Sequence, residues 1–158
     1  MFRVIRDIYS SNKARVLIGQ NLSPEFDILS GVLQGSKLGP ILFLIFINDL
    51  LEKLNTSNLG ATLDNIIISS LGFADDIVLI SDCPLKLQSL INICSDWVQE
   101  NGMEFNTSKC KVMVINRSSI NLKFTLNYEI LEIVKKYKYL GVTITTRRLT
   151  SLYTDSQQ

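Results

Sequence analysis

The sequence predicts an α+β domain in which helices pack on one face of an antiparallel sheet. Two segments, residues 40–54 and 85–98, carry apolar side chains at helical spacing. Short runs rich in β-branched and aromatic residues alternate with them and are separated by turn residues, a pattern typical of hairpins. At 158 residues and 46% hydrophobic, the chain is long enough for one domain with its own core.

The first forty residues are expected to form a helix and a hairpin. Residues 1–11 carry apolar side chains at helical spacing without a preceding capping residue, which indicates the last turns of a helix. Residues 14–18 and 26–29 can pair as strands around a turn at residues 19–21. The glycines of the following loop, residues 31–36, permit unusual backbone angles and close approach of another backbone. Simple chain punctuation is the alternative reading of this loop.

Residues 40–54 predict a helix that begins near Pro40. Apolar side chains cover most of its circumference, so we expect it to be largely buried. The polar residues 55–62, which include Gly60, predict a surface loop. The longest unbroken apolar run, residues 41–47, is far shorter than the ~20 residues that cross a bilayer, so no membrane span is expected.

The strongest candidate for chemistry is the pair Asp75 and Asp76. Residues 66–74 and 77–80 predict two strands joined at this pair. Neighbouring side chains of an extended strand point to opposite faces, so only a tight turn would bring both carboxylates to one site. Two close like charges raise each other's cost of ionisation, and an oxygen-preferring cation such as Mg2+ removes that cost. The alternative is an ordinary turn, in which Asp bonds its own backbone.

The second half of the chain predicts another helix followed by short strands. The helix after Pro84 stops at Asn101-Gly102, a good C-terminal signal. The expected segments after it are extended chain at 103–106, a turn carrying Lys109, a strand at 111–115, a polar loop at 116–121, and closing strands at 124–126 and 139–145. Residues 147–158 lose periodicity, so no element is predicted there.

Composition excludes several kinds of chemistry. The chain has no histidine, which excludes a Ser-His-Asp triad, a His-liganded zinc site and imidazole acid–base catalysis, so any metal must be held by oxygen. Sixteen basic against fifteen acidic residues give a formal charge of +1, which predicts no large basic surface but permits a local basic groove. Three scattered cysteines without a signal pattern predict reduced intracellular thiols.

Four motifs, in this order, resemble those of the reverse transcriptases of non-LTR retrotransposons. GVLQG at residues 31–35, continued to INDL at 47–50, resembles the second palm motif, and FADD at 73–76 resembles the acidic hairpin. Residues 102–110 resemble the next motif, and YLG at 139–141 resembles the primer-grip strand. The resemblance implies a polymerase palm-like antiparallel sheet without fingers or a full thumb. Residues 1–146 are expected to form this partial palm domain, and residues 147–158 an irregular tail or the start of a truncated thumb connection.

The resemblance also implies a function, that of an RNA-directed DNA polymerase. Two Mg2+ ions, or Mn2+ in their place, would stabilise the attacking primer 3′-oxygen and the leaving pyrophosphate. The implied partners are an RNA template, a DNA primer and deoxynucleoside triphosphates, with fingers, thumb and endonuclease segments missing from this chain. The implied site residues are Asp75 and Asp76 as catalytic metal ligands, Lys109 as a weaker catalytic candidate, Gly31, Gln34 and Gly35 for template and nucleotide, and Tyr139, Leu140 and Gly141 for the primer grip. A merely solvated side chain is the alternative for Lys109.

Two departures from the family pattern bear on activity. Residues 36–40, Ser-Lys-Leu-Gly-Pro, replace the usual acidic residue and proline after the Gln-Gly pair. The first palm motif, an aspartate-bearing strand upstream of the glycine loop, is missing, and Asp27 lies too close to Gly31 to replace it. The chain alone is therefore expected to be inactive. We also expect the glycine loop and the acidic turn to border one cleft, because nucleotide and metals must meet within a few ångströms.

Other readings stay open at this stage. The chain is alternatively a non-catalytic nucleic-acid-binding remnant or an inert relic of a retroelement. An unrelated α+β interaction domain would require the motifs to coincide by accident. The resemblance implies an intracellular, nuclear location, for which no targeting signal is visible in the sequence.

Overall fold

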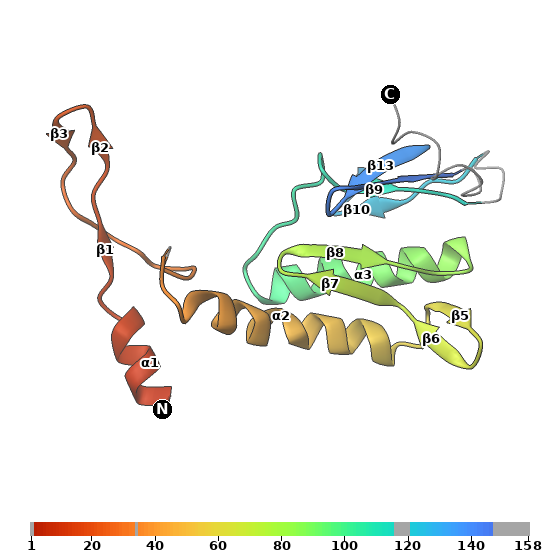
Figure 1. Ribbon diagram of the computed structural model, residues 1–158, viewed down its shortest axis with the longest axis horizontal. Helices are drawn as coiled ribbons and strands as arrows, with labels where there is room; N and C mark the ends of the chain where they lie inside the picture. Colours follow the sequence, from red (N-terminus) through yellow and green to blue (C-terminus); the bar gives the residue numbers. More distant parts are fainter. Residues whose placement is uncertain (1, 34, 116–120, 147–158) are drawn as a thin grey trace, which may run out of the picture. The chain divides into compact units, whose positions relative to one another are not determined.

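The computed structural model describes residues 2–33, 35–115 and 121–146 (Figure 1). The chain divides into two compact units, residues 1–46 and 47–158, and each unit is described by itself. Helix α2 (Gly39–Thr56) begins in the first unit and ends in the second.

The first unit contains the predicted helix, α1 (Phe2–Tyr9), and a two-part hairpin whose pairing differs from the predicted one, because residues 17–18 pair with 21–22 and only residues 13–14 pair with 26–27. The paired strands are β1 (Lys13–Ala14) with β4 (Phe26–Asp27), and β2 (Leu17–Ile18) with β3 (Asn21–Leu22). Between the two parts, the Ser23 N–H donates to the Val16 carbonyl and the Val16 N–H donates to Ser23 Oγ, both at 2.9 Å. These two hydrogen bonds, one between backbone groups and one to a side chain, therefore link the two parts of the hairpin.

Helix α2 confirms the predicted helix but corrects its predicted burial. The exposed and buried apolar side chains separate along the helix: Ile41, Leu44 and Ile45 are 55%, 53% and 67% exposed, whereas Ile47, Leu50 and Leu54 are buried. An all-round apolar pattern indicates that a helix can be covered, but coverage requires a packing partner at each position. The expectation of a largely buried helix is therefore wrong for its first turns.

The second unit begins with two hairpins, β5 (Ala61–Leu63) with β6 (Ile66–Ile68), and β7 (Ser70–Phe73) with β8 (Asp76–Leu79). The strand predicted over residues 66–74 is thus broken at the fully buried Ser69. Gly60 packs against this break, where a Cβ atom would collide with the Ile68 carbonyl. The predicted surface loop at 55–62 is shorter than expected, because α2 continues to Thr56 and β5 starts at Ala61.

Helix α3 (Pro84–Glu100) confirms the second predicted helix, including its end at Asn101 and at Gly102, whose φ is +62°. Its buried residues are Leu90, Ile91, Cys94, Trp97 and Val98. Ile91 joins a core cluster with four residues from the chain beyond α3, namely Val112, Phe124, Leu126 and Leu131. Figure 1 shows α3 alongside the second half of α2, with the β7–β8 hairpin next to both helices.

The strands after α3 pair as β9 (Lys111–Val112) with β12 (Glu132–Ile133), β10 (Thr125–Leu126) with β11 (Glu129–Ile130), and β13 (Lys136–Tyr139) with β14 (Val142–Thr145). All strands of the described residues form separate two-stranded sheets, and the β9–β12 pair is parallel. The α+β class is confirmed, but the expected single antiparallel sheet is replaced by these pairs. The break at Ser69 shortens a run that the sequence predicts as one continuous strand.

Part of the predicted C-terminal half differs from the structure. The strand predicted at 111–115 is paired only at 111–112, and the closing strand at 139–145 is divided by a turn at Leu140 and Gly141. Most of the predicted polar loop at 116–121 and the whole segment 147–158 lie outside the described residues. No helix within the described ranges is both long and apolar enough to cross a bilayer.

Cys83, Cys94 and Cys110 are free in the structure, and their reduced intracellular setting stays a prediction. Burial raises the pKa of Cys94 to about 12, so this thiol stays protonated at neutral pH. Cys83 precedes α3, and hydrogen bonds from the backbone of Lys86 and Leu85 lower the pKa of its thiol.

Candidate functional site

Asp75 and Asp76 lie together at the exposed end of the β7–β8 hairpin, as predicted, but the turn is shifted by one residue, so that Asp76 is the first residue of β8. Phe73 pairs with Asp76, so Ala74 and Asp75 form a two-residue turn, in which Ala74 has φ +53°. Both aspartates are exposed, and neither carboxylate has an ion pair or hydrogen bond within the described part of the chain. Their oxygens are therefore open to water or to a cation.

The register of the hairpin decides which way Asp76 points. Gly72 faces α2, because a Cβ atom there would stand 2.9 Å from Leu51 Cδ1. Successive residues of a strand alternate between faces, and directly paired residues share one face. Phe73 and its partner Asp76 therefore lie on the hairpin face away from α2, and Phe73 is 63% exposed there. A ligand can reach Asp76 from this open face.

The donor set at the turn fits a hard divalent cation. Carboxylate oxygens suit Mg2+, which keeps several waters and takes one or two carboxylates from a protein. Within residues 2–33, 35–115 and 121–146, no group of three or more His, Cys, Asp or Glu side chains is placed to hold a metal ion. The turn itself carries two carboxylates, Asp75 and Asp76.

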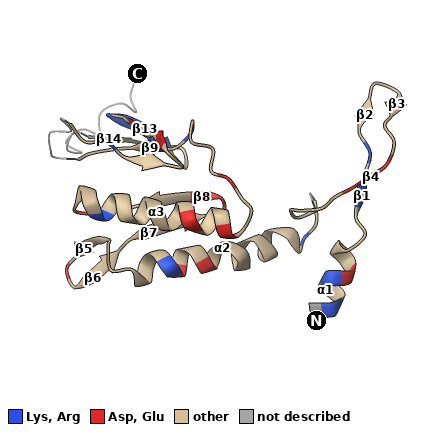
Figure 2. Ribbon diagram, turned by 180° about the vertical axis from the view of Figure 1, so that it is seen from behind, with Lys and Arg blue, Asp and Glu red and all other residues tan. Residues whose placement is uncertain are grey.

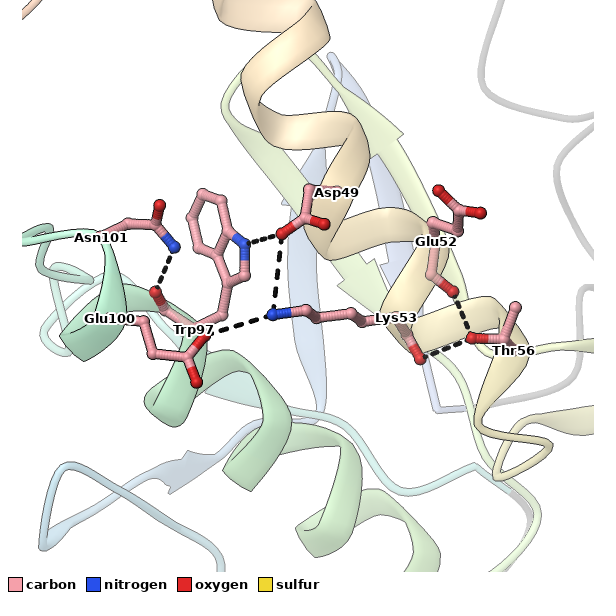
Figure 3. Close-up of polar contacts among 7 residues, drawn as sticks. All are labelled: Asp49, Glu52, Lys53, Thr56, Trp97, Glu100 and Asn101. Carbon is pink, nitrogen blue, oxygen red and sulfur yellow. Dashed lines mark hydrogen bonds and ion pairs between the residues drawn. The ribbon is translucent and has the colours of Figure 1, made fainter.

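A polar network joins α2 to α3 (Figure 3). The Trp97 indole N–H donates to Asp49 Oδ2 at 2.7 Å. Lys53 Nζ lies 3.7 Å from Asp49 Oδ2 and 3.2 Å from Glu100 Oε2. The hydrogen bond with Glu100 raises the pKa of Lys53. Sequence reasoning missed this network, although Trp97 is the single tryptophan and a buried indole N–H usually finds a partner.

We expect Asp49→Ala to lower the free energy of unfolding by about 1–2 kcal/mol, because it removes the acceptor of a buried indole N–H. Asp49→Asn keeps an acceptor oxygen and should lose less. Urea unfolding followed by the fluorescence of Trp97 measures both changes. The matched control is Glu52→Ala, an exposed side chain on the same helix. Equal midpoints for Asp49→Ala and this control would show that the bond adds nothing to stability.

The glycine loop belongs to the first unit. Gly31 and Gly35 have φ of +92° and +81°, so the expectation of unusual backbone angles is confirmed. Apart from each glycine and its two chain neighbours, no heavy atom of the described residues lies within 4 Å of where a Cβ would stand at Gly31 or Gly35. Gln34 lies outside the described residues. The common cleft with the acidic turn, which belongs to the second unit, stays a prediction.

Lys109 lies in an exposed turn, as predicted. The turn is held by backbone bonds from the Lys109 and Cys110 N–H groups to the Asn106 carbonyl, at 3.0 and 3.3 Å. The Tyr137 hydroxyl also donates to the Lys109 carbonyl at 3.3 Å, which links the turn to β13. The catalytic role of the Lys109 side chain stays a prediction.

The predicted primer-grip residues lie at a hairpin tip. Tyr139 is the last residue of β13, and Leu140 and Gly141 form the turn with φ of +47° and +83°. These angles at both turn residues suit a tight hairpin. Lys136 and Lys138 alternate with the tyrosines of β13 and make this strand basic (Figure 2).

Comparison with known proteins identifies the class. The family model described as "Reverse transcriptase (RNA-dependent DNA polymerase)" matches residues 2–144, and the chain belongs to this family. The resemblance inferred from the four motifs is therefore confirmed.

Curated relatives place the similarity more closely. The chain is 29% identical, over 90% of its length, to a Pol polyprotein from the type-1 retrotransposable element R2 of Popillia japonica. It is 33% identical over 78% of its length to that of the type-2 element R2DM of Drosophila melanogaster. It is also 29% identical over 96% of its length to the RNA-directed DNA polymerase from the mobile element jockey of Drosophila funebris. The chain spans only 24%, 12% and 18% of these relatives, respectively.

Proposed function

We propose that this chain forms the part of an RNA-directed DNA polymerase that holds the catalytic metal ions during nucleotide addition to a primer. One observation carries the proposal: a hairpin within the family match ends in two exposed, adjacent carboxylates. Two such groups, which have no partner among the described residues, are suited to a divalent cation, whereas a merely structural Asp pair would be expected to bond its own turn.

In the proposed reaction, the oxygen of the primer 3′-hydroxyl attacks the α-phosphorus of a deoxynucleoside triphosphate. A phosphorus–oxygen bond forms as the bond to pyrophosphate breaks. Bound Mg2+, or Mn2+ in its place, supplies positive charge at the attacking and leaving oxygens. Asp75 would bind the metal, and Asp76, on the open face of the hairpin, would be the second carboxylate beside it. Together they would hold the cation in place of some of its water ligands.

Other residues have supporting roles in the proposal. Gly31 and Gly35 let the template and nucleotide backbones approach, and Gln34 offers amide hydrogen bonds. Lys109 neutralises or protonates the pyrophosphate, and Tyr139, Leu140 and Gly141 contact the primer. RNA template, DNA primer, deoxynucleoside triphosphates, and fingers, thumb and endonuclease segments are the partners. The chain acts inside the cell, and the resemblance implies the nucleus.

The experiment is RNA-templated primer extension by chimeras of the R2 protein of Popillia japonica, which aligns with this chain over 152 residues. One chimera carries residues 2–144 of this chain, and the other carries only residues 66–80. We expect Mg2+-dependent extension by at least one chimera at a rate within about tenfold of the parent, since catalysis tolerates substitutions that preserve ligand positions.

If both chimeras fold and bind the template–primer but neither extends it, the proposal is contradicted. That outcome would favour the alternative, a non-catalytic nucleic-acid-binding role. Circular dichroism and the binding isotherm separate it from simple misfolding, and the chimera with residues 66–80 leaves most of the parent intact.

A further inference from the structure

The β7–β8 hairpin rests on one face of α2 through small residues. Leu51 and Asn55 stand one helical turn apart on this face, and Gly72 and Ser70 stand two positions apart on β7. Leu51 packs against Gly72, because a Cβ atom at Gly72 would stand only 2.9 Å from Leu51 Cδ1. Asn55 bonds Ser70. One contact lies at each of two points along β7 and α2. Together they fix the position of β7 along the helix and its direction across it.

Asn55 accepts hydrogen bonds from the Ser70 N–H and hydroxyl groups, for which the β7–β8 hairpin itself offers no acceptor. The Ile80 N–H donates to the Ser69 carbonyl at 2.9 Å, so Ser69 and Ile80 form a hydrogen-bonded pair. Hydrogen-bonded and non-bonded pairs alternate in an antiparallel ladder, so the next pair, Ser70 with Leu79, turns its backbone groups outward. The outward Ser70 N–H donates to Asn55 Oδ1 at 3.1 Å, and the Ser70 hydroxyl donates to the same oxygen at 3.2 Å.

Asn55 Oδ1 accepts the hydrogen bond that the Ser70 N–H would otherwise donate to a neighbouring strand. Ser70 is only 5% exposed, so water cannot readily replace the acceptor. Ser70 also lies three residues before Phe73, roughly 10 Å of extended chain from the start of the turn. A small rotation of β7 at Ser70 is therefore enlarged at the tip of the hairpin.

We propose that Asn55 is a positioning residue that fixes the acidic turn by holding the first residue of β7 on α2. The inference deepens the proposed function and rests on it for the role of the turn as a metal site. Asn55 touches no reacting atom and acts through Ser70. Its side-chain oxygen, and not the rest of the amide group, is the feature that the position requires.

The test uses the 158-residue chain, labelled with nitrogen-15, with Mn2+ alone as the probe. Amide hydrogen exchange at Ile80 reports the hairpin, because its own bond to Ser69 is untouched by changes at Asn55. Paramagnetic broadening of the Asp75 and Asp76 amides reports Mn2+ at the turn. Asn55→Ala removes the acceptor, Asn55→Asp keeps a carboxylate oxygen in its place, and Glu52→Ala is the control on the same helix.

Asn55→Ala should speed exchange at Ile80 by about tenfold and weaken Mn2+ broadening at the turn, while exchange in α3 stays unchanged. Asn55→Asp should retain slow exchange at Ile80. If Asn55→Ala fails to fold, Ser70→Ala removes one of the two bonds and should give about a threefold effect.

Unchanged exchange at Ile80 in Asn55→Ala, or in the folded Ser70→Ala variant, would overturn the inference. The same holds if Asn55→Asp exchanges as fast as Asn55→Ala. A wild-type chain without Mn2+ broadening at the turn would instead count against the metal role in the proposed function, and the exchange rates would still decide the role of Asn55.

Discussion

Asp75→Asn in an active chimera lowers the rate of primer extension by about a thousandfold or more. Asparagine has nearly the same shape as aspartate but lacks the negative charge that holds a divalent cation. Asp75 lies in the turn between β7 and β8 and is exposed, so the change leaves the hairpin contacts in place. The loss should therefore appear in the chemical step and not in folding. Single-turnover extension of a labelled primer on an RNA template measures it.

The matched control for this change is Asp64→Asn. Asp64 also lies in a hairpin turn of the second unit, between β5 and β6, with φ of +49°, a conformation that Asn adopts readily. The control should extend the primer at the parent rate. If Asp75→Asn and Asp64→Asn are equally active, Asp75 is not a metal ligand and the acidic hairpin has another role.

Local patterns in the sequence predicted much of the fold. The helices α2 and α3 follow from apolar spacing with Pro near the start, and α3 ends at the predicted glycine. The acidic hairpin follows from two β-rich runs around a turn. These signals are carried by residues close in sequence, so they are readable without knowledge of the packing.

The errors arise where distant residues decide the outcome. Ser69 lies in a run that reads as one strand, but the backbone packing against Gly60 breaks it. The segment around Leu140 also reads as a strand, yet both Leu140 and Gly141 adopt positive φ and turn the chain. A glycine after a leucine was the available signal for this turn, and β-branched residues on its C-terminal side obscured it.

The residues of the candidate site also differ in how clearly the sequence reveals them. Asp75 and Asp76 were found because adjacent carboxylates between apolar runs are conspicuous in one sequence. Asp49 stands out in the sequence only as part of the INDL motif, and Asn55 does not stand out at all, because their partners lie 48 and 15 residues further along the chain. Candidate catalytic residues are therefore easier to predict from the sequence than the residues that position them.

The 158-residue chain alone should extend no primer under conditions in which an active chimera does. Two Mg2+ ions carry four positive charges, and in the proposed function this chain supplies one close carboxylate pair to hold them. A nucleotide-side ion without a ligand from an opposing strand would be poorly placed for in-line attack, which costs several kcal/mol of transition-state stabilisation. RNA-templated extension with equal concentrations of chain and chimera measures the difference.

Two controls make the negative result informative. Fluorescence of Trp97 establishes that the chain is folded, because this single tryptophan is only 2% exposed in the native state. Adding the chain to the chimera reaction tests for an inhibitor in the preparation. Mg2+-dependent extension by the isolated chain that disappears in its Asp75→Asn variant would refute the prediction, because it would mean that Asp75, Asp76 and the rest of this chain suffice to place both metal ions.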